Sequence, residues 1–126
     1  MLRYIKLWLS IGWLLILLVC YLSLATNPPD FKTEIEYLDK VKHFLAYFVL
    51  MGWFAQIYKT KQSRINNVLF FISMGVLLEI LQGISQVRTF EYSDMLANTS
   101  GVILAWFFTR GRLKDVLLSF ENRILN

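Results

Sequence analysis

Cysteine, proline and charge are all scarce in this sequence. Its single cysteine, Cys20, excludes an internal disulfide framework and any zinc site built from several thiolates. The two prolines, Pro28 and Pro29, are adjacent, so they mark one sharp break in the 126-residue chain. Charged residues make up only 17% of the chain, against about a quarter in a soluble domain. These absences argue against a soluble, disulfide-stabilised protein.

Hydrophobic residues, in contrast, make up 56% of the chain and lie in long runs separated by short charged segments. A helix that crosses a bilayer needs about 20 mostly apolar residues, or about 17 at the short end. Four runs meet or approach this requirement. The sequence therefore predicts one all-α membrane domain over residues 1–126, a four-transmembrane-helix bundle with spans at residues 7–24, 41–58, 67–84 and 94–109.

The first run has an alternative interpretation as a cleavable signal peptide. Arg3 and Lys6 precede it, and Ser23-Leu24-Ala25 resembles a cleavage site. The apolar core of a signal peptide has about 7 to 15 residues, and the uncharged run 7–24 is longer. A retained membrane helix is therefore favoured.

Basic residues predict the orientation of this bundle, because the cytoplasmic flanks of membrane spans carry an excess of lysine and arginine. Nine basic residues fall on the side that holds both termini: Arg3, Lys6, Lys59, Lys61, Arg64, Arg110, Arg112, Lys114 and Arg123. The other four, Lys32, Lys40, Lys42 and Arg88, fall on the opposite side. Both termini are expected in the cytoplasm, with the segments 30–42 and 85–93 outside.

The same asymmetry explains the formal net charge of +4. No basic run interleaved with aromatic residues stands on a soluble segment, so nucleic acid is not an expected partner. The expected partner is the lipid bilayer. The basic segment 110–114 is expected to fix the topology against anionic lipid. The pairs Phe70-Phe71 and Phe107-Phe108 are expected to contact lipid.

Polar residues mark the start of the second span. The pattern Thr33-Glu34-Ile35-Glu36 is typical of a capping box at the beginning of a helix. Asp39 and His43 are then four residues apart on one helical face, and Tyr47 lies one turn further into the span. Asp39 is expected to orient His43 and to influence its protonation. Lys40 lies beside them.

The third and fourth spans carry polar residues in the same half of the bundle. Glu79 would be strongly disfavoured against lipid, so it is expected to face the bundle or a wet cavity, with Gln82 on the same face. Asp94 and Asn98 begin the fourth span, and small residues such as Gly101 allow its close approach to another helix. Arg88, in the preceding loop, has the geometry to hold a carboxylate or a phosphate.

This convergence predicts a polar pocket at the outer face. The candidate catalytic residues are Asp39, His43, Glu79 and Asp94, and the candidate ligand-binding residues are Lys40, Tyr47, Gln82, Arg88 and Asn98. The four acid-base residues include types that bind divalent metals. The sequence contains no dedicated metal motif, however, so neither a metal nor another cofactor is expected.

Each of these residues also has a purely structural interpretation. Glu79 can form a salt bridge to Lys40 or Arg88 that merely fixes the bundle. Asp94 can cap the fourth helix, where the helix dipole favours a carboxylate. Tyr47 and Gln82 can serve as packing and interhelical hydrogen-bonding residues.

The chain resembles the VanZ-like family over roughly residues 36–108. The resemblance rests on Asp-Lys-Val-Lys-His-Phe at 39–44 with Tyr47, Glu-Ile-Leu-Gln at 79–82, Arg88, and Asp-Met-Leu-Ala-Asn at 94–98 followed by Gly101. The resemblance implies a multi-pass protein of the bacterial inner membrane. The family's named member is associated with resistance to teicoplanin, a glycopeptide antibiotic that acts on the cell wall.

Three hypotheses for the function follow. In the preferred one, the outward pocket binds or acts on a phosphate-bearing or glycan molecule of the cell envelope, including a lipid-linked one, and His43 exchanges a proton with a hydroxyl or water. The first alternative is a non-catalytic scaffold that binds lipid or a membrane partner. The second is proton-coupled transport, which four short helices would support only as a homo-oligomer. Whether the protein is an enzyme is left open.

Overall fold

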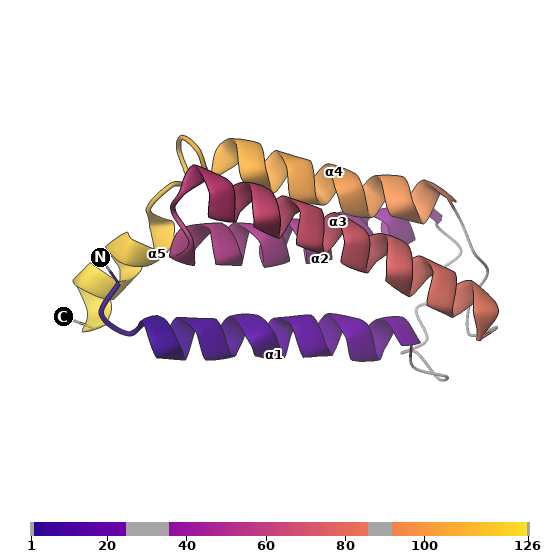
Figure 1. Ribbon diagram of the computed structural model, residues 1–126, viewed down its shortest axis with the longest axis horizontal. Helices are drawn as coiled ribbons and strands as arrows, with labels where there is room; N and C mark the ends of the chain where they lie inside the picture. The colour runs from indigo at the N-terminus through magenta and orange to yellow at the C-terminus, as the bar shows by residue number, and fades with distance from the viewer. Residues whose placement is uncertain (1, 25–35, 86–91, 126) are drawn as a thin grey trace.

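A computed structural model describes residues 2–24, 36–85 and 92–125; for residues 36–39 only the backbone is described. These ranges contain helices and turns and no strand. The elements in chain order are α1 (Ile5–Leu24), α2 (Glu36–Ile57), α3 (Lys61–Ile84), α4 (Tyr92–Phe108) and α5 (Val116–Phe120), followed by a turn of π-helix, η1 (Glu121–Leu125) (Figure 1). The prediction of an all-helical protein is confirmed.

The four long helices coincide with the four predicted spans, but α2 and α3 begin earlier than predicted. In α3 the reason is Thr60, whose hydroxyl accepts a hydrogen bond from the Ser63 N–H at 3.1 Å and so caps the helix at Lys61. Hydropathy locates the apolar part of a helix and not its polar ends. The predicted capping box at residues 33–36 lies largely outside the described residues.

Two of the described helices, α1 and α3, are long and apolar enough to cross a membrane. Their 20 and 24 residues correspond to about 30 and 36 Å at 1.5 Å per residue. Helix α4 has 17 residues, and α2 carries Lys40, Lys42 and His43 near its start. Among the described helices, α2 and α4 therefore do not meet the same requirement of length and hydropathy. The four-span topology and the cytoplasmic termini stay predictions.

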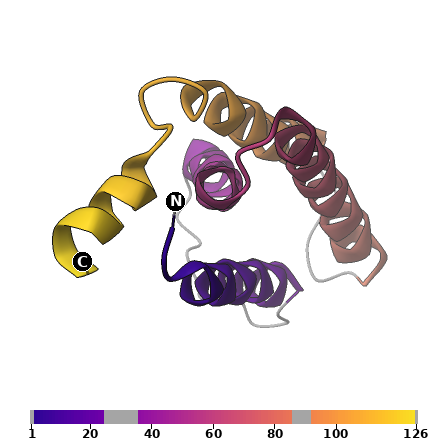
Figure 2. The same ribbon diagram turned by 60° about the vertical axis from the view of Figure 1, so that its left-hand side comes forward.

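Helix α2 lies at the centre of the bundle, with α1, α3 and α4 around it (Figure 2). Its most extensive packing is with α4. The core consists of Ile16, Tyr47, Leu50, Met51, Phe54, Ala55, Phe71, Val102 and Ala105. Without a hydrophobic driving force in lipid, such contacts hold helices together by close van der Waals packing.

Outward faces of the long helices are apolar, as lipid contact requires. In α1, Leu14, Leu17 and Leu18 are all more than half exposed in the isolated chain. Phe107 and Phe108 are also exposed, in agreement with their predicted lipid contact. The prediction was wrong for Phe71, which is buried in the core against Phe54, whereas its neighbour Phe70 is 46% exposed.

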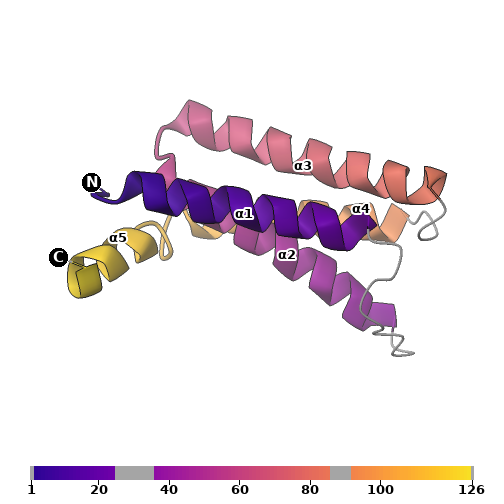
Figure 3. The same ribbon diagram turned by 90° about the horizontal axis from the view of Figure 1, so that it is seen from below.

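The helices alternate in direction, so the bundle has two distinct ends (Figures 1 and 3). We call the end that holds the start of α1, the turn between α2 and α3, and α5 the terminal end. At the opposite end, the far end, α1 and α3 finish and α2 and α4 begin. The short helix α5 was not predicted. It lies at the terminal end and contacts α2.

Candidate functional site

An ion pair at the far end joins α2 and α4 near the start of each helix. The Lys40 ammonium donates to Asp94 Oδ1 at 2.5 Å. The Asp94 side chain is only 3% exposed, whereas that of Lys40 is 27% exposed. A buried carboxylate requires a charged or hydrogen-bonding partner, and Lys40 provides it. Asp94 also lies in the first turn of α4, where the helix dipole favours negative charge.

His43 lies one turn inward from this ion pair and contacts α4 through both ring nitrogens. Its Nδ1 is 3.2 Å from Asn98 Oδ1, and its Nε2 is 3.7 Å from Asp94 Oδ2. The histidine side chain is 12% exposed. The imidazole is thus held between an amide and a carboxylate and remains slightly exposed.

Regular helix spacing explains why these residues meet. Lys40, His43 and Tyr47 recur at intervals of three and four residues, so they share the face of α2 directed at α4. Asp94, Asn98 and Gly101 repeat the same spacing on α4, and all three are buried. At Gly101 the two backbones approach so closely that an added methyl group would overlap the Phe44 carbonyl oxygen.

Helix α3 closes this arrangement from a third side. A Cβ atom at Gly75 would lie 3.3 Å from the side chain of Asn98 and 3.4 Å from the ring of Tyr47. Glu79 follows Gly75 by one turn toward the far end and is 1% exposed. His43 and Asp94 are also one turn further toward the far end than Tyr47 and Asn98. The three acid-base residues therefore occupy neighbouring levels of the bundle.

Further polar contacts extend to α1. The Gln82 amide donates to the Ser23 carbonyl oxygen at 2.7 Å. All four long helices thus contribute to the polar region of the far end.

Two candidate residues are not placed. Arg88 and the side chain of Asp39 lie outside the described part of the chain, so their predicted roles stay predictions. The described partner of the His43 Nδ1 atom is Asn98, which had been predicted to bind ligand. Among the described residues, no group of three or more histidine, cysteine or acidic side chains is arranged to hold a metal ion.

The contacts define what His43 can do chemically. When Asn98 Oδ1 accepts from Nδ1, that nitrogen carries the proton and Nε2 retains a lone pair. Nε2 can then take a proton from a hydroxyl or a water, and the neighbouring Asp94 carboxylate stabilises the resulting imidazolium. Lys40 adds a positive charge beside the same carboxylate.

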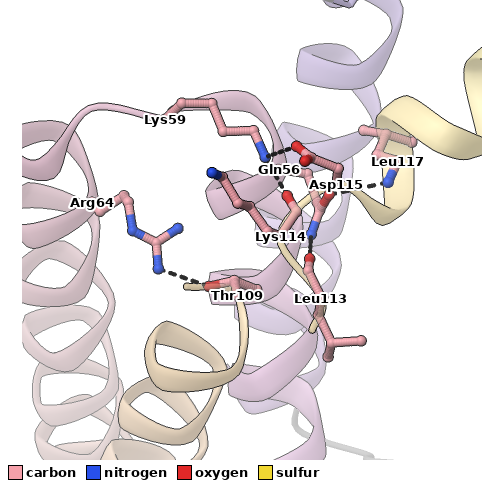
Figure 4. A network of polar contacts seen from close by, with 8 residues as sticks. All are labelled: Gln56, Lys59, Arg64, Thr109, Leu113, Lys114, Asp115 and Leu117. Carbon is pink, nitrogen blue, oxygen red and sulfur yellow. Dashed lines mark hydrogen bonds and ion pairs between the residues drawn. The ribbon is translucent and has the colours of Figure 1, made fainter. Parts of the chain in front are cut away.

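A second polar network, at the terminal end, was missed by the sequence analysis (Figure 4). The Gln56 amide donates to the Leu113 carbonyl oxygen at 2.5 Å, and its Oε1 accepts from the Leu117 N–H at 3.0 Å. Arg64, interpreted as a flanking charge, is buried and donates to the Trp106 carbonyl oxygen at 2.7 Å. The signal in the sequence was that Gln56 and Arg64 each lie within one turn of the end of a predicted span.

Glu121 forms the tightest contact between the two ends of the chain. This carboxylate is fully buried and accepts from the Arg3 N–H at 2.6 Å, the Tyr4 N–H at 3.0 Å and the Trp8 indole at 2.6 Å. Burial raises the pKa of Glu121, whereas these three hydrogen bonds lower it, and the pKa lies below its ordinary value of 4.5. Glu121 thereby satisfies free amides at the start of α1.

These features define a small helical membrane protein with a buried acid-base cluster at one end of its bundle. The family model VanZ/LLP1 matches residues 9–117, which is most of the chain. The protein therefore belongs to the VanZ/LLP1 family, and the resemblance expected from the sequence is confirmed. Comparison with curated proteins and with solved structures gave no match.

Proposed function

We propose that this VanZ/LLP1-family protein binds a phosphate-bearing or polyhydroxylated molecule of the cell envelope at the far end of its bundle. His43 would exchange a proton with a hydroxyl or water of the bound molecule. The observation that supports this proposal best is the position of His43, fixed between Asn98 and the buried Asp94 while its side chain remains 12% exposed. A histidine held in this way is pre-oriented for acid-base chemistry.

The proposal includes an orientation. Nine of the 13 lysine and arginine residues of the chain lie at the terminal end, which favours a cytoplasmic position for that end. The far end then faces the outside of the bacterial inner membrane, where envelope precursors and glycopeptide antibiotics are found.

Each residue has a role in this proposal. Lys40, the more exposed member of its ion pair, would attract an anionic group. Arg88, which follows α3 in the sequence, is proposed to assist it. Glu79 supplies a second buried carboxylate near the level of His43. Asn98 and Asp94 are positioning residues that act through His43.

One set of contacts favours the alternative of a non-catalytic scaffold. The Gln82 hydrogen bond joins α3 to α1, and the Lys40–Asp94 pair joins α2 to α4. Polar bonds of this kind also hold membrane helices together without any ligand. The two functions differ in what an isosteric substitution does.

The discriminating experiment expresses the wild-type chain, His43→Gln, Asp94→Asn and the control Asp115→Asn in a bacterial host and measures teicoplanin susceptibility together with the amount of protein in the membrane. Asp115 is exposed and lies at the terminal end. We expect both far-end variants to lose the protection given by the wild-type chain at near-normal abundance, and the control to keep it. Loss of folded protein would favour the scaffold, and full protection by both variants would refute the proposed site.

A further inference from the structure

A groove of about 520 Å³ lies at the terminal end, away from the acid-base cluster. It is formed by the turn after α4 together with one side of residues 116–125, which we call the C-terminal helical segment. Its lining is of two kinds. The polar lining residues that matter here are Arg112, Lys114 and Arg123, and the apolar ones are Val116, Phe120 and Ile124.

The polar half of the groove is strongly basic. Arg112, Lys114 and Arg123 are all exposed, and within the described part of the chain none of their side chains forms a hydrogen bond or ion pair. The single acidic side chain of the lining, Asp115, is 3.2 Å from the Lys59 ammonium, which offsets its charge. The groove therefore presents an uncompensated positive surface to an anion.

The apolar half is a continuous stripe. Val116, Phe120 and Ile124 are spaced by four residues, so they follow one another along one face of the C-terminal helical segment. They are 52%, 49% and 60% exposed. An exposed apolar stripe bordered by cations is typical of a helix that lies in the interface of a membrane.

The frame around the groove is fixed by bonds to the bundle. Gln56 bonds the backbone on both sides of the turn, at Leu113 and Leu117 (Figure 4). Lys59 donates to the Lys114 carbonyl oxygen. At the other end of the segment, Glu121 is bonded to the start of α1, and Phe120 packs edge-on against Trp8. The segment that forms the groove is thus held against the bundle at both of its ends.

We propose that this groove binds an anionic phospholipid of the leaflet at the terminal end. The headgroup phosphate would be held by Arg112, Lys114 and Arg123, and an acyl chain would lie along Val116, Phe120 and Ile124. The charge selects an anion, and the adjoining apolar stripe selects a lipid over a soluble phosphate. This site is separate from the far-end cluster and does not depend on the function proposed for it.

The test uses the purified full-length protein in detergent with phosphatidylglycerol or phosphatidylcholine, and measures bound lipid by native mass spectrometry. We expect phosphatidylglycerol to bind preferentially. The triple variant Arg112→Gln, Lys114→Gln, Arg123→Gln should lower its affinity by about 100-fold, since each cation near an anionic lipid contributes appreciably. A second variant, Arg112→Lys with Arg123→Lys, retains Lys114 and all three positive charges. It should keep most of the lipid binding of the wild-type protein.

A matched control removes three cations of the same end outside the groove: Lys6→Gln, Lys61→Gln and Arg110→Gln. This control should keep the lipid preference, and an equal loss in it would overturn the proposal. Val116→Thr with Ile124→Thr should weaken lipid binding without affecting the binding of glycerol phosphate. Equal affinity of the wild-type protein for glycerol phosphate and for the lipid, or no preference for phosphatidylglycerol, would also overturn it.

Discussion

Gly101 on α4 faces the backbone of Phe44 on α2 with no room for a side chain between them. A Cβ atom at Gly101 would overlap the Phe44 carbonyl oxygen and lie 3.0 Å from the Phe48 nitrogen. These neighbours are backbone atoms, which a rotamer change cannot move away. The close crossing lies one turn inward from the contact between His43 and Asn98, so the glycine sets the distance between the two halves of the candidate site.

Gly101→Ala should therefore force α2 and α4 apart. We expect the free energy of unfolding to fall by about 1–3 kcal/mol, as in other overpacked interiors, and the His43–Asn98 contact to lengthen. Unfolding in detergent micelles measures the first effect. The matched control is Gly52→Ala on α2, where an added Cβ atom meets nothing within 4 Å. Similar destabilisation by both variants would show that loss of glycine itself, and not the helix crossing, is responsible.

The Lys40–Asp94 pair makes a second prediction. Lys40→Met leaves the Asp94 carboxylate, 3% exposed, without its cation, and should lower the free energy of unfolding by about 1–3 kcal/mol. Asp94→Asn should lower the free energy of unfolding by a smaller amount, because an amide oxygen still accepts a hydrogen bond from Lys40. In the double variant the buried charge is gone, so part of the loss should be recovered. Unfolding curves of all four proteins test this, and strict additivity of the two losses would contradict the coupling.

Glu121 predicts a pH-dependent contact at the terminal end. Because its folded-state pKa lies below the ordinary value of 4.5, the stability it contributes is fully present above that value and is lost as the pH falls through the lowered pKa. The Trp8 indole N–H resonance, which reports the bond to Glu121, should shift with a midpoint below 4.5.

In Glu121→Gln this shift of the Trp8 resonance should disappear. Trp13, which is 52% exposed and packs edge-on against Phe54, serves as the internal control and should not follow the same titration. A midpoint at or above the ordinary value in the wild-type protein would contradict the hydrogen-bonding explanation.

Topology provides the fourth prediction. In a Cys20→Ser background, single cysteines at Thr33, Gln62, Arg88 and Leu125 are treated in intact cells with a membrane-impermeant thiol reagent. Labelling at Thr33 and Arg88 alone is expected for four spans with cytoplasmic termini. Labelling at Gln62 and Leu125 alone would place the acid-base cluster in the cytoplasm, and labelling at all four positions would mean that the spans are misassigned.

Much of the fold and the composition of the site could be predicted from the sequence. Long apolar runs are read directly as helices, and helix periodicity places His43 with Tyr47, and Asp94 with Asn98, on common faces. A carboxylate such as Glu79 cannot face lipid, so its burial could also be predicted. These inferences depend on local spacing and on the solvent, both of which are written in the chain.

Pairing between helices was not predictable in the same way. The sequence allowed Lys40 to pair with Glu79, but in the structure it pairs with Asp94, and Asn98 is the described partner of the His43 Nδ1 atom. The order of helices around a bundle depends on which small residues allow close contact, and Gly75 and Gly101 decide this only together with the surfaces that they meet.

The sequence by itself determined that this protein is helical, that it belongs in a membrane, and that polar residues such as His43, Glu79 and Asp94 lie in one half of it. Only the tertiary structure decided that His43 lies between Asn98 and Asp94, and that Glu121 bonds the amides at the start of α1. The physical reason is range: hydropathy and helix periodicity act over a few residues, whereas these contacts join groups that are far apart in the chain and meet only when the helices pack.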